Sequence, residues 1–219
     1  MDLLLHPADD PGRHRPDPRG RLSTVGHASA FRAFARLARR ARIRFMVIGG
    51  TFRDVAVRAA STRDIDIVLV DRADLPEESM RAAGFRREPG SAHAWQYHSG
   101  DRVIDLEVAA VASSTEQAGP FSVAFQHAVT ATIEGIRVPV PRLEDYVILK
   151  LLAAADRRRR ARDLADVQFA LQASATGSRG ALSIAALRAR LRELYGVRGQ
   201  QLKDLVALLR QVHRAAHGK

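Results

Sequence analysis

One segment, residues 45–70, limits the folds open to this chain more than any other. It reads FMVIGGTFRDVAVRAASTRDIDIVLV: a short apolar run, two adjacent glycines, a helix-like stretch and a second apolar run that contains two aspartates. Residues two apart in a strand lie on the same face of a sheet, so Asp64 and Asp66 share one face while Ile65 and Ile67 share the other. The segment predicts the order strand, glycine turn, helix, strand.

The two aspartates predict a metal site. Neighbouring carboxylates repel each other, and a divalent cation such as Mg²⁺, which binds carboxylate oxygens, relieves that cost. Two metal ions about 3.5 to 4 Å apart hold the attacking and leaving oxygens in many phosphoryl and nucleotidyl transfers. Such a site needs a further carboxylate, and the run RVIDLEVA offers Asp105 and Glu107 on one face of another strand. Asp105 lies deeper in the apolar run and is the preferred third ligand, with Glu107 as the alternative.

The paired glycines lie where the first strand passes into the helix. Glycine lets backbone N–H groups approach a phosphate closely, and a helix N-terminus adds partial positive charge. A hydroxyl and a guanidinium follow within one turn. We therefore expect Gly49, Gly50, Thr51 and Arg53 to bind the triphosphate of a nucleotide facing the carboxylates. Glycine pairs also occur in plain turns, so this prediction depends on the combination with the two aspartates.

The remaining patterns divide the chain into three parts. Residues 1–25 contain the Pro- and Gly-rich run HPADDPGRHRPDPRG and predict a flexible tail. Residues 26–140 predict a mixed α/β domain that starts with an amphipathic helix over residues 28–43 and ends with a hairpin turning near Gly135. Residues 141–219 predict helices only. The expected fold class is α+β: a mixed sheet with flanking helices, followed by a C-terminal helical bundle.

Composition excludes some sites and concentrates positive charge in the helical part. The chain has no cysteine, which excludes disulfides and Cys-ligated zinc. No apolar run approaches the roughly 18 residues of a membrane span, and the N-terminus lacks the basic region of a signal peptide, so we expect a cytoplasmic protein. Residues 139–219 carry 16 basic and 7 acidic side chains, against 19 and 17 in residues 1–138. This charge favours a polyanion such as nucleic acid, unless it only reflects an arginine-rich composition.

The stretches GGTFRD and RDIDIV resemble the nucleotidyltransferase superfamily, which includes DNA polymerase β, the CCA-adding enzymes and antibiotic nucleotidyltransferases. The superfamily signature is a GG or GS turn, a DxD strand and a later single carboxylate, and the resemblance covers residues 45–108. It implies a nucleotidyltransferase-fold sheet, an NTP substrate, and Mg²⁺, with two ions expected, held by Asp64, Asp66 and Asp105.

A second stretch, VPVPRLEDYVILKLLAAADRRRRARDLADVQFAL, is similar to the helical part of the AbiEii and MenT toxins, the nucleotidyltransferases of toxin–antitoxin systems. The matching residues are Lys150, Ala154, Arg158, Asp163 and Asp166. The resemblance implies that Lys150 reaches the β- or γ-phosphate and that Asp163 orients this lysine or a nucleophile. The residues alone fit a purely structural role equally well, in which Lys150 lies along a core helix and Asp163 and Asp166 cap helices or form ordinary salt bridges with the RRRRAR run. Many of the toxins carry Ser where this chain has Gly50.

The resemblance to the toxins further implies transfer of NMP to the 3′ end of tRNA, blocked translation and a cognate antitoxin. The run RRRRAR is expected to bind RNA, unless it is only an exposed bend between helices. Its arginines are Arg157, Arg158, Arg159, Arg160 and Arg162. Two alternatives remain. A small-molecule, antibiotic-type nucleotidyltransferase would need acidic residues around a cationic acceptor, and a non-catalytic RNA-binding protein would have no need to keep three repelling carboxylates together.

Overall fold

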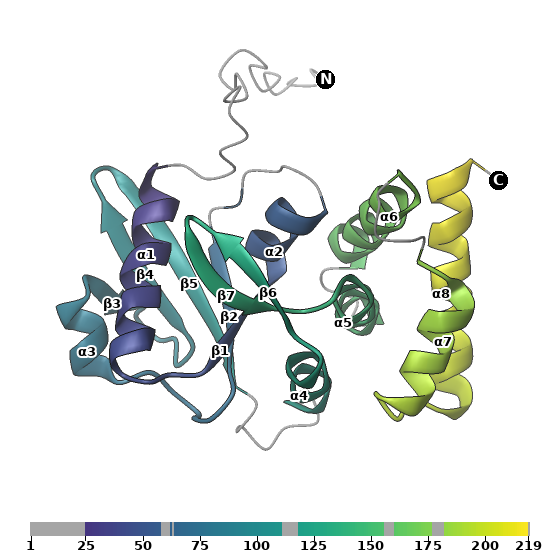
Figure 1. Ribbon diagram of the computed structural model, residues 1–219, viewed down its shortest axis with the longest axis horizontal. Coiled ribbons are helices and arrows are strands. Elements are labelled where there is room, and N and C mark those ends of the chain that lie inside the picture. The colour runs from purple at the N-terminus through teal and green to yellow at the C-terminus, as the bar shows by residue number, and fades with distance from the viewer. Residues whose placement is uncertain are drawn as a thin grey trace, which may run out of the picture.

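The computed structural model of the chain describes residues 25–57, 62, 64–110, 118–155, 160–176 and 182–218. These residues form a sheet with helices packed on it and, beside the sheet, a group of helices (Figure 1). The tail predicted for residues 1–25 lies outside the described residues except for Val25. None of the described helices is long and apolar enough to cross a membrane.

A five-stranded mixed sheet forms the centre of the N-terminal part. In spatial order its strands are β1 (Phe45–Ile48), β2 (Asp64–Leu69), β5 (Arg102–Ala110), β4 (Ala94–Ser99) and β3 (Phe85–Arg87). β2 and β5 run parallel, and the other neighbouring pairs are antiparallel. The strands predicted from the apolar runs are all present. β3 was not predicted, because three residues are too few to show a period of two.

Each face of the sheet is covered differently. α1 (Val25–Arg40) packs on β4 and β5 and buries Phe31, Phe34 and Leu37. At one end of the opposite face, Met46 and Val68 pack against α4 (Ala118–Gln126) through Ala124. The rest of that second face carries the polar residues of β2 and β5. The two remaining helices of this part are α2 (Gly49–Ala56) and α3 (Glu77–Ala82).

A hairpin connects the sheet to the helical part, as predicted. It consists of β6 (Val129–Ile133) and β7 (Ile136–Val140), and β7 lies beside β1. The turn places Glu134 at φ 51° and Gly135 at φ 78°. Positive φ at both central positions is the geometry of a type I′ turn, which suits the twist of a two-residue hairpin.

All four helices predicted for the C-terminal part are present. They are α5 (Leu143–Ala155), α6 (Arg160–Thr176), α7 (Ile184–Glu193) and α8 (Gly199–His217). One hydrophobic cluster runs from α1 through the sheet to α8 and so crosses the predicted domain boundary. At that boundary the rings of Phe52 and Tyr146 lie 4.8 Å apart between centroids. The division into domains of residues 26–140 and 141–219 stays a prediction.

Candidate active site

Strand register places the predicted carboxylates on one face of the sheet. Across the parallel pair β2 and β5, Asp64 lies opposite Asp105, and Asp66 lies opposite Glu107. Opposed residues of neighbouring strands point to the same face, so all four carboxylates share the face away from α1. Asp105 is half-buried and Glu107 exposed. Both remain candidates for the third carboxylate, since the register brings both beside the β2 aspartates.

The glycine turn touches this face directly. Gly49 begins α2 with φ 60°, and the Gly50 N–H donates a hydrogen bond of 2.9 Å to Oδ2 of Asp66. A Cβ on Gly49 would lie 2.0 Å from the same oxygen, and one on Gly50 would lie 2.5 Å from Oγ1 of Thr62. Only glycine fits at these two positions without moving a neighbour. The N-cap residue Ile48 makes no side-chain hydrogen bond to the free N–H groups at the start of α2. The Asp66 carboxylate accepts from one of these groups instead.

The charge of Asp66 is costly in this position. Burial raises the pKa of its carboxyl above the usual value, and the negative charge of Asp64 raises it further. The Gly50 N–H and the positive charges of Lys150 and Arg162 act in the opposite direction but do not cancel the effect. A carboxylate that is buried next to another carboxylate is stabilised by a cation, as the prediction of a metal site requires.

Thr51 and Arg53 lie inside the protein. The Thr51 hydroxyl donates to the Asp64 carbonyl over 3.3 Å and lies 3.4 Å from Nε2 of His27 in α1. Arg53 donates to Oδ1 of Asp54 at 3.0 Å from Nε, with a second contact of 2.9 Å from its terminal nitrogen. Burial lowers the pKa of Arg53, but the hydrogen bond and charge of Asp54 outweigh it and raise the pKa. In this structure both side chains hold α2 in place, and their predicted contact with a triphosphate stays a prediction.

Lys150 connects the two parts of the chain through an ion-pair network. Its Nζ lies 2.8 Å from Oδ1 of Asp163 and 3.0 Å from Oδ2 of Asp166. The other oxygen of Asp166 lies 3.7 Å from the Arg53 guanidinium. The network thus joins α2, α5 and α6, and the orienting role that the resemblance implies for Asp163 stays a prediction.

The predicted RNA-binding arginines are described only in part. Residues 157–159 lie outside the described residues, and the side chain of Arg160, at the start of α6, is not described either. Arg162 is exposed, and its positive charge acts on Asp66. This arginine therefore lies near the carboxylate face, and its predicted contact with RNA stays a prediction.

Three side chains of the site were missed in the sequence. Asp54 accepts from Arg53 and, over 3.1 Å, from the Thr62 N–H, and so closes the segment between α2 and β2. The arginine beside it was the available signal. His27 occupies the buried face of α1, and burial lowers its pKa below the usual value. A lone histidine in an apolar stripe was its signal, whereas nothing local marks Thr62.

The donor set suits a metal ion that arrives with a nucleotide. Among the residues that the structure describes, no group of three or more His, Asp or Glu side chains could hold a metal ion alone. Mg²⁺ is generally bound by one or two carboxylates together with water and substrate phosphates. Asp64 and Asp66, with a further carboxylate across the strand pair, fit that mode of binding.

This sheet and the helices around it define a nucleotidyltransferase fold. An antigenic nucleotidyltransferase-like protein from Paracoccidioides brasiliensis aligns with a TM-score of 0.61 at 17% identity, over 90% of this chain and 91% of that one. The antibiotic-resistance factor ANT(2″)-Ia aligns with a TM-score of 0.47 at 14% identity, over 88% and 95%. The first likeness is evidence of the fold alone. No curated protein sequence matches significantly.

The family follows from the sequence as a whole. The family described as "Nucleotidyl transferase AbiEii toxin, Type IV TA system" matches residues 37–217. The chain therefore belongs to the AbiEii nucleotidyltransferase family. The match confirms the family resemblance and, with the structural likeness, the predicted fold class.

Proposed function

We propose that this nucleotidyltransferase transfers NMP from an NTP to an RNA 3′ end, with the acceptor end of tRNA as its substrate. The observation that carries the proposal is the geometry around β2: its register with β5 sets Asp64 beside Asp105, and the Gly50 N–H at the start of α2 donates to Asp66. A nucleotide bound at this turn would present its α-phosphate to the carboxylates.

The carboxylate face would hold Mg²⁺ through Asp64, Asp66 and Asp105. The bound ion would lower the pKa of the attacking hydroxyl and offset the charge that develops on the phosphate. The 3′ oxygen would form a bond to the α-phosphorus as the bond to pyrophosphate breaks, and Asp105 would take up the hydroxyl proton. The start of α2, with Gly49 and Gly50, would bind the phosphates through backbone N–H groups and the helix dipole.

Lys150 is the proposed ligand of the β- or γ-phosphate. It is 18% exposed and held by two carboxylates, Asp163 and Asp166, whose combined charge exceeds its own. These partners would orient the ammonium until a phosphate oxygen offers a further acceptor, because a lysine has three donor positions. Asp163 would then act as a positioning residue.

An RNA acceptor is supported by charge. The helical part holds a clear excess of basic residues, and Arg162 lies near the carboxylate face. A polyanionic acceptor is attracted by such a field, whereas a cationic small molecule is repelled. Modified tRNA 3′ ends could not be aminoacylated, so we further propose that the protein blocks translation and that a cognate antitoxin opposes it, as the family implies.

The test is incorporation of each labelled NTP into total tRNA with Mg²⁺. We expect label at tRNA 3′ ends with one or more nucleotides, loss of at least about 100-fold in Asp64→Ala, and loss when EDTA removes the ion. Asp101→Ala, at an exposed aspartate in the turn before β5, is the matched control and should keep full activity. Binding of NTP without incorporation into any RNA would overturn the RNA acceptor and favour a small-molecule one.

A further inference from the structure

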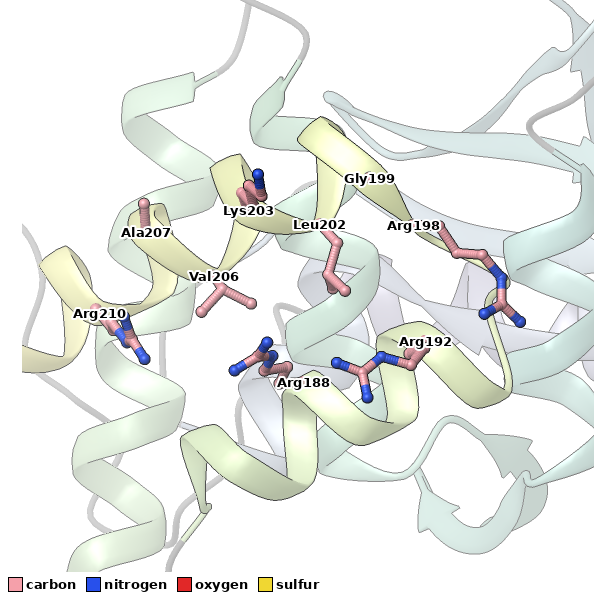
Figure 2. Close-up of a pocket in the computed structure, with 9 residues that line it drawn as sticks. All are labelled: Arg188, Arg192, Arg198, Gly199, Leu202, Lys203, Val206, Ala207 and Arg210. Carbon is pink, nitrogen blue, oxygen red and sulfur yellow. The ribbon is translucent and has the colours of Figure 1, made fainter.

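A positively charged groove of about 450 Å³ lies between α7 and α8 (Figure 2). Five of the residues that line it are cationic, and none is acidic. The lining residues are Arg188, Arg192, Arg198, Gly199, Leu202, Lys203, Val206, Ala207 and Arg210. Figure 1 shows α7 and α8 on the far side of α5 and α6 from the sheet, so this groove is separate from the carboxylate face.

The cations of the groove are not used to hold the fold together. Arg188 and Arg192 are exposed on α7, and neither forms an ion pair with a described acidic residue. Arg190 on the same helix contrasts with them, because its Nε and Nη2 each donate over 2.7 Å to a carboxylate oxygen of the buried Asp145. Like charges at i and i+4 repel each other on a helix, and a bound polyanion removes that repulsion.

The floor of the groove favours phosphate over a protein helix. Leu202 and Val206 are only 8% and 6% exposed, and none of the large exposed hydrophobic side chains among the described residues lines the groove. An amphipathic helix docks through apolar anchors at i, i+3 and i+4, for which this floor offers little area. Exposed arginines around a sealed floor are instead typical of contacts to a phosphate backbone.

The start of α8 adds to the positive end of the groove. Its N-cap residue is Arg198, which makes no side-chain capping hydrogen bond, and Gly199 follows as the first helical residue. The first backbone N–H groups of a helix have no partner within the helix and attract anions. Arg198 and Gly199 both line the groove, so this helix end faces the same space as the cations.

We propose that the groove between α7 and α8 binds the sugar–phosphate backbone of RNA. It would hold the body of the acceptor RNA, away from the 3′ end that reacts at the carboxylate face. The proposal rests on the proposed function for the identity of the RNA as acceptor, but RNA binding in the groove can be measured without any transfer.

The experiment compares two charge-reversed double variants in RNA binding without NTP. Arg188→Glu with Arg192→Glu reverses the charge on the α7 side of the groove. Arg36→Glu with Arg40→Glu is the matched control. Arg36 and Arg40 are also exposed, four residues apart on one helix, and lie on α1. Fluorescence anisotropy with a labelled tRNA at several salt concentrations gives the affinity and its salt dependence, and circular dichroism verifies that both variants are folded.

We expect the groove variant to bind RNA at least about 10-fold more weakly. Each lost phosphate contact lowers the slope of log affinity against log salt by about 1, so the slope should fall by about 2. The slope measured for the control variant should differ from the wild-type slope by much less than the change expected from one phosphate contact. Equal weakening in both variants would overturn the proposal, because it would reflect net charge alone. Competition by poly-glutamate that exceeds competition by RNA would overturn it in favour of an acidic protein partner.

The same proteins separate this proposal from the proposed function. Transfer of NMP to tRNA by the wild type, together with unchanged RNA binding by the groove variant, would overturn the groove and leave the function standing. Weakened binding by the groove variant, in a protein that transfers NMP to no RNA, would support the groove and overturn the function.

Discussion

At the scale of the residue, Gly49 is where the backbone and a catalytic candidate meet. Its φ of 60° already favours glycine, and a Cβ there would lie 2.0 Å from Oδ2 of Asp66. Asp66 would have to rotate away and lose its bond from the Gly50 N–H. Two independent causes, backbone conformation and side-chain collision, therefore exclude other residues at this position.

Gly49→Ala should cost both stability and activity. We expect a loss of more than about 2 kcal/mol in the free energy of unfolding, measured with urea, since positive φ alone costs an alanine about 1 to 2 kcal/mol. Gly135→Ala is the control, because Gly135 also has positive φ (78°) but its Cβ would meet no atom within 4 Å. Equal losses in the two variants would show that Asp66 does not contribute.

Asp66→Asn should stabilise the protein and inactivate it. The pKa of Asp66 is raised by burial, so its contribution to stability is complete below the unfolded pKa and is lost as the pH rises through the folded pKa. At pH 7.5 the wild type carries this cost and the amide does not, while the amide oxygen can still accept from Gly50. We expect the variant to have a higher Tm than the wild type, and this difference in Tm should become smaller as the pH falls. Its activity should be reduced at least about 100-fold. Asp101→Asn should change neither; a lower Tm for Asp66→Asn would contradict the argument.

The carboxylates and glycines of the candidate site could be predicted from the sequence because their pattern lies within short stretches of the chain. The alternation of Asp64 and Asp66 with isoleucine, and the glycines before a helix, are visible in the sequence. The partner of Arg53 in α6 was not, because this ion pair with Asp166 joins residues distant in the chain. The same holds for the bond from the Thr62 N–H to Asp54, which depends on how the intervening segment folds back.

At the scale of the element, helix α4 is stabilised by tertiary contacts and was not predicted from the local sequence. α4, with the sequence AGPFSVAFQ, opens with glycine and proline, which favour turns. Proline is tolerated in the first turn of a helix, and Ala124 packs on Met46 and Val68 of the sheet. α8 was predictable from its sequence alone, because it is long and carries an apolar stripe of its own.

The contact between α5 and α7 depends on one buried carboxylate. Asp145 is fully buried and accepts two bonds of 2.7 Å from Arg190 and one of 2.9 Å from the Tyr195 hydroxyl. Arg190→Ala should reduce the free energy of unfolding by about 3 to 5 kcal/mol, because it leaves a buried charge unpaired. Arg188→Ala, one exposed arginine earlier on the same helix, should stay within about 0.5 kcal/mol of wild type. Urea unfolding of both variants measures the difference, and an equally small loss in the two variants would contradict this role of Arg190.

At the scale of the whole molecule, the candidate active site lies at the join between the sheet and the C-terminal helices. The network of Arg53, Asp166 and Lys150 lies where α2 meets α5 and α6, beside the rings of Phe52 and Tyr146. Sequence indicated two parts from the change of pattern near residue 140. It could not indicate how firmly they are joined, because that depends on contacts between residues far apart in the chain.

The shared core predicts that both parts unfold together. Trp95, the one tryptophan in the chain, is buried in β4 and reports on the sheet, whereas far-UV circular dichroism is dominated by helices, including the four of the C-terminal part. In urea the two signals should therefore follow one transition, although chains of this size with two domains often show two.

Phe52→Ala, which removes one ring of the contact between the sheet and the helices, should lower the urea midpoint and let the two transitions separate. Phe85→Ala is the matched control, since it removes a buried ring that packs on Tyr97 within the sheet part. This variant should destabilise the protein, but its two unfolding signals should still follow one transition. Two separate transitions in the wild type would show that the continuous core does not couple the sheet to the helices, and that the ion pairs of the active site form between independently stable units.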